Sequence, residues 1–307
     1  MSVHSGWYLP AFLSELTQDV SPLDIGDRRL VAVRSGGAVR VFDADCPHRG
    51  AHLGHGGQLA DGCLVCPFHG LRVSLGGADP KRSVREHQVI VAGDALFVRL
   101  SDEPGDDRGF TRAIAELSDT HPLVPAVTEP MRAPAELVVE NAFDTDHFTA
   151  LHKVYAVRGM AHHLGDDGEL VMDGEFPMPA SPWQGGGRPD GGGYVPRFYA
   201  RAFSPHVVVT LFGPPEQAHA IVTAAVPDAA GGCVVRVAIG VREGHEGDLS
   251  MLIAGSKRAL AEDLAVWEHL NPRAVPNYGP RDAGVAAFRA FCAGFPALAD
   301  PYEGETA

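Results

Sequence analysis

Short apolar runs separated by turn residues dominate the first hundred residues of the chain. LVAVRS, AVRVFDA, CLVCPF, HQVIVAG and ALFVRL are rich in β-branched residues and of the length of a strand. Gly36-Gly37 and Gly93-Asp94 stand between neighbouring runs, where they predict hairpin turns. The pattern therefore predicts a small antiparallel β domain over residues 1–110, closed by a polar linker at 101–110.

The rest of the chain, 111–307, predicts a second, α+β domain. Residues 168–245 alternate strand-like runs with turns, and residues 248–270 repeat apolar positions at three-to-four spacing, which predicts the longest helix. Asp248 or Ser250 is its expected cap. ELVVENAF is expected to begin as a strand and to pass into a helix over DTDHFTALHKVYAV, and FRAFCAGF predicts a short helix.

A glycine-rich loop at 183–194 is open to two interpretations. Six of its twelve residues are glycine, and Trp183 and Tyr194 stand at its ends. Such a loop is either a surface loop without a role or a lid over a binding site.

Composition narrows the classes of protein that this chain belongs to. Its 307 residues suit two domains, and 45 % of them are hydrophobic. A net charge of −14 argues against nucleic-acid binding. There is no run of eighteen apolar residues, and the N-terminus does not resemble a signal peptide, so we expect a cytoplasmic protein without a membrane span. Five cysteines are then better read as thiols or metal ligands than as disulfides.

Two short motifs combine cysteine with histidine. They are Cys46-Pro47-His48 and Cys66-Pro67-Phe68-His69, with seventeen residues between His48 and Cys66. Two loops that each offer one thiolate and one imidazole form a mixed Cys2His2 set. Zinc accepts such a set, but zinc fingers pair cysteine with cysteine and histidine with histidine. The C-x-H and C-x-x-H order is typical of a Rieske [2Fe–2S] cluster.

The segment resembles the Rieske domain in CPHRGA, L-G-x-G and CPFHG. The resemblance implies that Cys46 and Cys66 hold one iron and that His48 and His69 hold the other. Two neutral imidazoles in place of thiolates raise the reduction potential to about −150 to +300 mV. Leu71 and Val73 replace the aromatic residues that the family often carries there. Zinc stays the alternative.

A second pair of histidines, His147 and His152, is less clear from spacing alone. Five residues on a regular helix turn through about 500°, so the two side chains would lie about 140° apart. Without a distortion of the helix they would not face one ion. Taken alone, the pair is compatible with two scattered surface histidines.

The context of that pair resembles the mononuclear iron site of Rieske non-haem iron oxygenases. The motif N-x-x-D-x-x-H-x-x-x-x-H follows the Rieske segment at the expected distance. The resemblance implies that His147 and His152 bind Fe(II) together with one acid from a later helix. Asp263 is the expected acid, as the second residue of an E-D pair. Glu262 and Asp282 are the alternatives.

Two further roles rest on the same resemblance. Asp144 would bridge the two metal centres by a hydrogen bond to a Rieske histidine of a neighbouring subunit, unless it only caps a helix. Asn141 would lie beside the iron without binding it. The family also implies a helix-grip domain, in which a large antiparallel sheet wraps a long C-terminal helix, and a head-to-tail homotrimer.

The function implied is that of a Rieske oxygenase terminal component. It would use O2, a [2Fe–2S] cluster and a mononuclear Fe(II) to hydroxylate, demethylate or desaturate a small, apolar organic molecule. A separate NAD(P)H-dependent reductase, with or without a ferredoxin, would supply the electrons, because the chain has neither G-x-G-x-x-G after a strand nor a plant-type cluster motif.

Residues 263–295 are more loosely similar to the branch that contains 3-ketosteroid 9α-hydroxylases and cholesterol 7-desaturases. The alternatives to an oxygenase are a Rieske-type electron carrier and a zinc-stabilised ligand-binding protein.

Overall fold

The chain folds into three antiparallel or mostly antiparallel sheets and five α-helices among the residues described. The structure is a computed structural model that describes residues 3–101, 103–177, 195–245, 247–271 and 273–299. Among those residues, no helix has the length and apolar character needed to cross a membrane. The α+β class expected from the sequence is confirmed. The loop expected at 183–194 lies outside the described residues.

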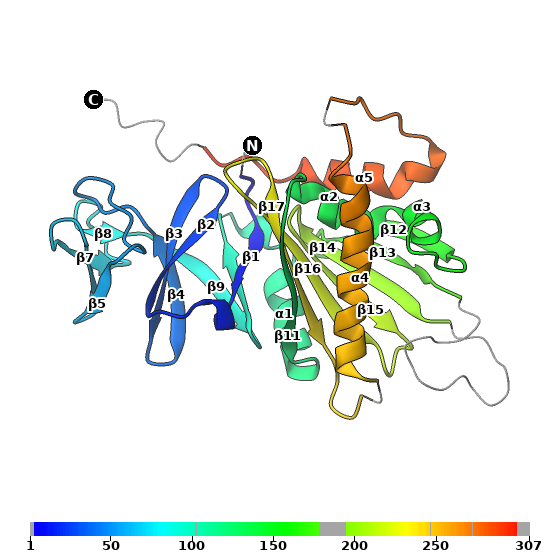
Figure 1. The fold of residues 1–307 in the computed structure, drawn as a ribbon, viewed down its shortest axis with the longest axis horizontal. Coiled ribbons are helices and arrows are strands. Elements are labelled where there is room, and N and C mark those ends of the chain that lie inside the picture. The colour runs from blue at the N-terminus through cyan, green and yellow to red at the C-terminus, as the bar shows by residue number, and fades with distance from the viewer. Residues whose placement is uncertain (1–2, 102, 178–194, 246, 272, 300–307) are drawn as a thin grey trace.

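Two sheets form the N-terminal half (Figure 1). The six-stranded sheet has the order β1 (Trp7–Phe12), β10 (Ala95–Arg99), β9 (Glu86–Ala92), β4 (Ala38–Asp43), β3 (Arg28–Ser35), β2 (Val20–Ile25). The four-stranded sheet has the order β5 (Gln58–Ala60), β6 (Cys63–Val65), β7 (Arg72–Leu75), β8 (Ser83–Val84). Both glycine turns join strands as predicted, with φ +59° and +83° at Gly36 and Gly37, where a side chain would be strained.

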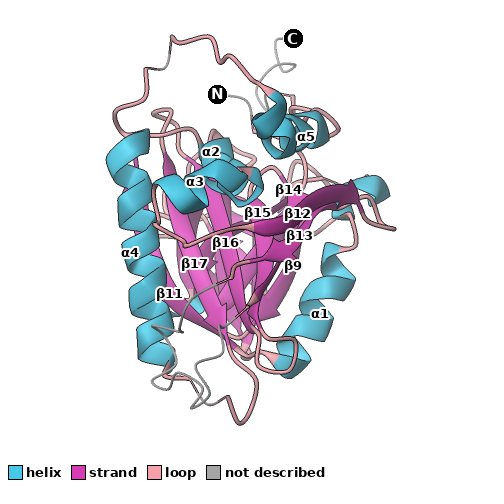
Figure 2. Cartoon of the chain, turned by 90° about the vertical axis from the view of Figure 1, so that its right-hand side faces the viewer, coloured by secondary structure: helices cyan, strands magenta, loops and turns pink. Residues whose placement is uncertain are grey.

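A seven-stranded antiparallel sheet forms the second half. Its order is β11 (Leu123–Met131), β17 (Cys233–Gly240), β16 (His219–Pro227), β15 (Val207–Gly213), β14 (Arg197–Ser204), β13 (Leu170–Glu175), β12 (Arg158–Leu164). The helices are α1 (Phe110–Thr120), α2 (Ala135–Glu140), α3 (Thr145–Ala150), α4 (Leu249–Trp267) and α5 (Ala283–Cys292). Figure 2 shows α4 beside the sheet, with α2, α3 and α5 gathered at one end of it.

The long helix packs on the sheet through apolar contacts. Leu260 of α4 belongs to the same buried cluster as Val235 and Ile239 of β17. The carboxylate of Asp248 accepts the main-chain N–H of Ser250 at 2.8 Å, which confirms Asp248 as the cap. A long C-terminal helix held by a large antiparallel sheet is the helix-grip arrangement expected from the resemblance.

The two halves share one hydrophobic core. Trp7 and Phe97 of the six-stranded sheet pack with Phe110 of α1 and with Phe203 and Val222 of the large sheet. The boundary predicted at residue 110 falls at the start of α1. It stays a prediction, because this core joins residues from both sides of it.

The prediction for ELVVENAF is wrong in its first part. This segment forms α2 and not a strand. Ala135, Val138 and Val139 are the buried residues of α2, and their spacing of three and four places them on one helical face. Tertiary packing of that face overrides the β preference of the two valines.

The helix predicted over DTDHFTALHKVYAV is shorter than expected. It ends at Ala150, and the main-chain N–H of Val154 then bonds to the carbonyl of Phe148 at 2.9 Å. Lys153 has a φ of +56°, so the chain has turned away from the helix. His152 therefore lies beyond the helix end, and the distortion that the histidine spacing required is present.

Candidate metal centres and substrate cavity

The two Cys-Pro loops have the same main-chain hydrogen bonds. In the first, the N–H of Gly50 bonds to the carbonyl of Cys46 at 2.8 Å. In the second, the N–H of Gly70 bonds to the carbonyl of Cys66 at 2.9 Å. The φ values are +66° at Gly50 and +69° at Gly70, so both turns depend on glycine. The sequence thus builds two matched loops, each with a cysteine at its base.

The four residues expected to hold the cluster come together. Cys46 and Cys66 are each 2 % exposed and are in hydrogen-bond contact, whereas His48 and His69 are exposed, with ring centroids 4.7 Å apart. Burial raises the pKa of the Cys46 thiol, and the neighbouring Cys66 raises it further. A cation is needed to stabilise thiolates here, so this donor set fits an iron–sulfur cluster.

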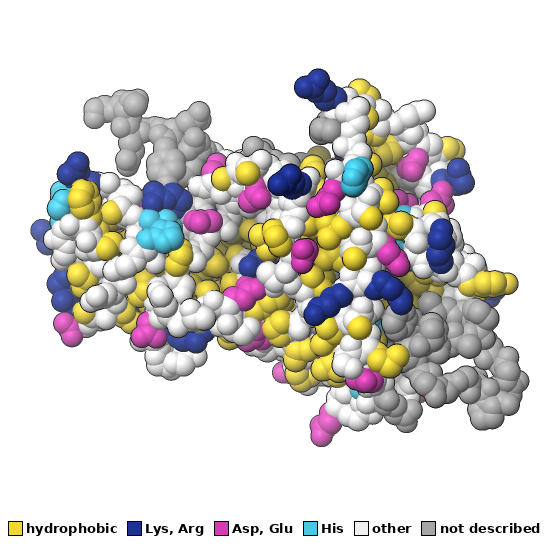
Figure 3. Space-filling view, viewed as in Figure 1, with side chains coloured by type: hydrophobic (Ala, Val, Ile, Leu, Met, Phe, Trp, Pro, Cys, Tyr) yellow, Lys and Arg dark blue, Asp and Glu magenta, His cyan; other side chains and the backbone are white. Residues whose placement is uncertain are grey.

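The exposed side of these loops is the part of the cluster site that a partner protein can reach. The guanidinium of Arg49 lies 5.4 Å from the ring centroid of Phe68, whose side chain is 56 % exposed. Figure 3 shows Lys and Arg side chains at the end of the molecule that carries the four-stranded sheet, although the whole chain has a net charge of −14. Cys63, the third cysteine of this region, is half-buried on β6.

The second predicted centre also assembles. His147, His152 and Asp263 each offer one ligand atom, and these atoms all lie within 4.8 Å of one another. Nδ1 of His147 donates to the carbonyl of its own helix cap, Asp144, at 2.6 Å. That hydrogen bond leaves Nε2 of His147 available as the atom that binds a metal.

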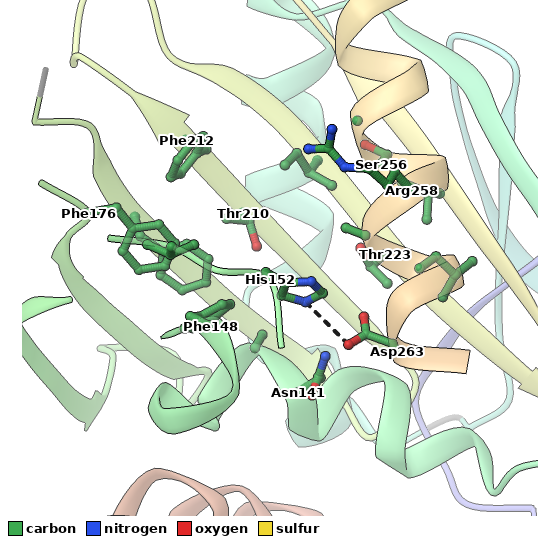
Figure 4. Close-up of a pocket in the computed structure, with 18 of the residues that line it drawn as sticks. Asn141, Phe148, His152, Phe176, Thr210, Phe212, Thr223, Ser256, Arg258 and Asp263 are labelled. Carbon is green, nitrogen blue, oxygen red and sulfur yellow. Dashed lines mark ion pairs between the residues drawn. The ribbon is translucent and has the colours of Figure 1, made fainter. Parts of the chain in front are cut away.

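The two neighbouring acids of α4 contact different nitrogens of His152. Oε2 of Glu262 accepts from Nδ1 at 2.8 Å, and Oδ1 of Asp263 lies 3.2 Å from Nε2 (Figure 4). A carboxylate on the outer nitrogen fixes the tautomer of a metal-binding histidine. Glu262, the alternative ligand, therefore acts on His152 from outside the triad.

The triad fits a divalent cation. Asp263 is only 7 % exposed, and its Oδ1 is buried without a hydrogen bond of good geometry. Burial acts to lower the pKa of His152, but contacts with Asp263 and Glu262 outweigh it and raise the pKa. Burial lowers the pKa of His147. Two carboxylates thus favour positive charge at this spot, and two imidazoles with one carboxylate form a set that suits iron.

The remaining predicted residues surround the triad. The carboxylate of Asp144 caps α3 by accepting the N–H groups of Asp146 and His147 at 3.1 and 3.4 Å, and its side chain is 36 % exposed. Asn141 begins the 3-10 turn Asn141–Phe143 and points toward Asp263 in Figure 4. Asp282 bonds instead to the N–H of Gly279 at 2.6 Å and is not part of the triad.

An apolar cavity of about 790 Å³ opens beside the triad, between α4 and the large sheet. The volume lies in the range of small-molecule pockets, roughly 300–1,000 Å³. Four phenylalanines form much of one wall (Figure 4). They are Phe148, Phe176, Phe198 and Phe212. Phe176 and Phe198 stack with ring centroids 5.1 Å apart, so this wall is a packed aromatic surface.

Comparison with known proteins supports the interpretation of the first centre. The Rieske [2Fe-2S] domain family matches residues 6–89, which contain all four cluster residues. This chain carries a Rieske domain. The match agrees with the Rieske interpretation of CPHRG and CPFHG, and the ligand roles of the four residues stay predictions.

The chain is also similar in sequence to curated proteins. The chain is 31 % identical over 160 residues to cholesterol 7-desaturase of Bombyx mori, which is 48 % of this chain and 35 % of that protein. It is 29 % identical over 171 residues to the oxygenase component of chloroacetanilide N-alkylformylase of Rhizorhabdus wittichii, which is 50 % of this chain and 47 % of that protein. The chain thus covers less than half the length of either relative, and the similarity to cholesterol 7-desaturases expected from the sequence is confirmed.

Solved structures match the fold across both halves. Dicamba monooxygenase bound to dicamba matches with a TM-score of 0.71 and 20 % identity, over 96 % of this chain and 98 % of that chain. NdmB of Pseudomonas putida CBB5 matches with a TM-score of 0.70 and 21 % identity, over 93 % and 89 %. The Rieske domain and the helix-grip domain therefore occur together in known folds of this length.

Sequence reasoning missed residues of the cavity wall. His219 and His245 belong to no recognisable sequence motif, yet both line the cavity, with ring centroids 6.5 Å apart. Burial lowers the pKa of His219 to about 4, helped by the neighbouring His245 and His121. They come from β16 and from the loop before α4, and no spacing in the sequence links them.

Proposed function

We propose that this chain is the terminal oxygenase component of a Rieske oxygenase system. It uses O2 and electrons from outside to hydroxylate, demethylate or desaturate a small, apolar organic molecule. The observation that carries the proposal is the triad of His147, His152 and Asp263 at the wall of an apolar cavity, in a chain that also carries a Rieske domain.

The chain's own residues have distinct tasks in this proposal. His147, His152 and Asp263 would hold Fe(II), which would supply the activation of O2. Glu262 and the carbonyl of Asp144 hold the outer nitrogens of the two histidines, and so direct both rings. The aromatic wall excludes water from the reacting bond and orients the substrate.

Electrons enter at the Rieske domain. His48 and His69 are exposed, so a reductase or a ferredoxin can approach the iron that they hold. A separate NAD(P)H-dependent reductase, directly or through a ferredoxin, is the expected donor.

Electron transfer to the triad takes place between subunits in this proposal. The cluster loops lie at one end of the molecule and α3, which carries His147, lies at the other (Figure 1). A head-to-tail homotrimer brings the cluster of one copy beside the triad of the next and closes into a ring. The half-exposed carboxylate of Asp144 is the acceptor for a cluster histidine of the neighbouring copy.

The class of substrate follows from the cavity and the relatives together. The relatives' names refer to cholesterol and chloroacetanilide, and the structural neighbour was solved with dicamba. Cholesterol and chloroacetanilides are largely apolar, in agreement with the four phenylalanines of the wall. We therefore propose a largely apolar substrate, aromatic or polycyclic, that is attacked at a C–H bond facing the triad.

A single-turnover experiment tests the function without its natural reductase. The anaerobic, iron-loaded chain is reduced chemically at its cluster and mixed with O2 and one of four probes: a methoxybenzoate, an N-methylpurine, a chloroacetanilide or a sterol. The proposal expects cluster reoxidation coupled to product, as formaldehyde or as a hydroxylated or desaturated probe. The Asp263→Ala chain is the matched control and forms no product.

The same experiment separates the two alternatives. An electron carrier would reoxidise at equal rates in the wild-type and Asp263→Ala chains and form no product from any probe. A zinc-stabilised ligand-binding protein would hold no redox-active cluster. The triad argues against the carrier, because electron transfer by the cluster alone requires none of its three residues.

A further inference from the structure

A second cluster of metal-ligand side chains lies away from the triad. His4 precedes β1, Glu136 stands in the first turn of α2, and His206 lies in the turn between β14 and β15. Each offers one ligand atom, and these atoms all lie within 4.8 Å of one another. Three segments far apart in the sequence thus bring two imidazoles and one carboxylate to one point, near the N-terminal end of the described chain (Figure 1).

The imidazoles of this cluster have unused nitrogens. His206 is 1 % exposed, and neither of its ring nitrogens has a hydrogen-bond partner. Nδ1 of His4 is also buried without a partner. Buried polar atoms in proteins are almost always hydrogen-bonded, so three orphaned nitrogens around one carboxylate require an explanation.

The setting of His206 keeps its lone pair available. The ring stacks on Tyr8 with centroids 4.6 Å apart and an interplanar angle of 20°, which fixes its orientation. An oriented imidazole whose ring nitrogens have no other partner is suited to bind a metal ion.

We propose that His4, Glu136 and His206 bind a zinc ion that is separate from both iron centres. Two histidines and one glutamate are a known three-residue ligand set for zinc, with water in the fourth position. His4 and Glu136 are partly exposed, which gives the ion and its water a path from solvent. The inference does not depend on the proposed oxygenase function, because it uses none of the residues of the triad or of the cluster.

A metal here would fasten the N-terminal segment to the second half of the chain. The same segment is already tied by the N–H of Ser5 to the carbonyl of Pro296 at 2.9 Å, and by the N–H of Leu298 to the carbonyl of Val3 at 2.8 Å. The Ser204 hydroxyl donates to the carbonyl of Trp7 at 2.7 Å. An ion at His4 adds a cross-link to α2 and to the β14–β15 turn, and binding to the native state alone stabilises it.

The test counts zinc on chains that keep their Rieske cluster. A His152→Ala/Asp263→Ala background removes the iron triad, so the only zinc that it takes up from a low-micromolar zinc buffer belongs to other sites. Glu136→Gln and, separately, His4→Gln are added to this background. Glu129→Gln is the matched control, because Glu129 is an exposed acid on β11. Zinc and acid-labile sulfide are measured after dialysis.

The proposal expects one zinc per chain in the background and in the Glu129→Gln control, and none in the Glu136→Gln and His4→Gln chains. Losing a ligand should weaken zinc binding by more than the roughly 10–100-fold cost of losing an outer-shell partner. No zinc in the background, or an equal amount in all four chains, would overturn it. The Rieske circular dichroism spectrum shows that each variant is folded, and either ligand variant alone suffices for the decision.

Discussion

Oε2 of Glu262 lies 2.8 Å from Nδ1 of His152, while the next residue along α4, Asp263, faces the opposite nitrogen of the same ring at 3.2 Å. Adjacent residues on a helix point about 100° apart, so the imidazole sits between two carboxylates that diverge from one turn. In the proposed iron site, Asp263 would therefore bind the ion and Glu262 would orient His152.

The first prediction follows from that division. Asp263→Ala should lose the mononuclear iron and all turnover, because one of three protein ligands is gone. Glu262→Gln should keep the site but bind iron roughly 10–100-fold more weakly. Fe(II) titration of chains with an intact Rieske spectrum measures both.

Asp282→Asn serves as the matched acid variant for this titration, since Asp282 bonds to the main chain of Gly279 and lies outside the triad. It should bind iron as the wild type does. If Glu262→Gln lost iron completely while Asp263→Ala kept it, the two acids would have the opposite roles.

The second prediction concerns the carboxylate of Asp144. Asp144→Asn should slow electron delivery to the triad. The neutral amide, unlike the carboxylate, cannot stabilise a positive charge on a cluster histidine of a neighbouring copy. The iron content should stay unchanged, since the main-chain carbonyl of residue 144 holds the ring of His147 and asparagine can still cap α3. Stopped-flow reoxidation of the reduced cluster, with substrate and O2, measures the rate.

Capping has to be separated from electron transfer in that experiment. Asparagine is as good a helix cap as aspartate, so Asp144→Asn should cost little stability, whereas Asp144→Ala should cost about 0.5–2 kcal/mol. A reoxidation rate in Asp144→Asn equal to that of the wild type would remove the bridging role and leave Asp144 as a cap.

The parts of the molecule that could be predicted from sequence are those that depend on local residues. The cluster loops are local, because each needs only a cysteine, a histidine and a glycine such as Gly50 in the left-handed region. Hairpin turns and the Asp248 cap are local too. The start of α2 does not depend on local residues alone. Its helical face is decided by the partners against which Val138 and Val139 pack.

The third prediction is a pH dependence that arises at the cavity wall. Burial holds the pKa of His219 at about 4 in the folded chain, below its usual value near 6.5. As the pH falls from about 6.5 to 4, the unfolded chain takes up the proton before the folded chain does. The contribution of His219 to the free energy of unfolding is therefore fully present above about pH 6.5 and is lost over that window. The slope from this residue is at most about 1.4 kcal/mol per pH unit.

Replacing the histidine tests this linkage. His219→Gln should flatten the dependence of the free energy of unfolding on pH between 4.5 and 6.5, measured by urea unfolding. His163→Gln removes an exposed histidine of β12 and should leave the slope as it is. An unchanged slope in His219→Gln would show that His219 is not held neutral in the folded state.

The fourth prediction concerns Gly284, which packs against the turn Asn141–Phe143 beside the proposed iron site. A Cβ on Gly284 of α5 would lie 2.2 Å from the carbonyl oxygen of Phe143, which no backbone can accommodate without moving. Alanine is the better helix former by up to about 1 kcal/mol, but the clash outweighs this, so Gly284→Ala should cost about 1–3 kcal/mol.

That substitution should also reach the metal, because Phe143 ends the turn that begins at Asn141. Gly284→Ala is expected to lower the thermal midpoint and to weaken iron retention together. Gly105→Ala, where nothing lies within 4 Å of the added Cβ, should change neither. A Gly284→Ala chain as stable as the wild type would mean that α5 and the Asn141–Phe143 turn are less tightly packed than described.

The candidate site, like the fold, has parts that could be predicted from the sequence and parts that could not. The ligands His147, His152 and Asp263 could be proposed from motifs, but the role of Glu262 required the position of His152 relative to α4. The cavity wall could not be read from sequence at all, because Phe198 and Phe212 meet only through the register of β14 with β15.

The content of iron, zinc and acid-labile sulfide in anaerobically purified protein tests the central claim most directly. One Rieske cluster and one mononuclear iron predict about three irons and two sulfides per chain, with one iron lost in Asp263→Ala and the sulfide unchanged. Zinc without sulfide would contradict the account at the Rieske loops. Two irons and two sulfides, with no further Fe(II) taken up on titration, would contradict it at the triad.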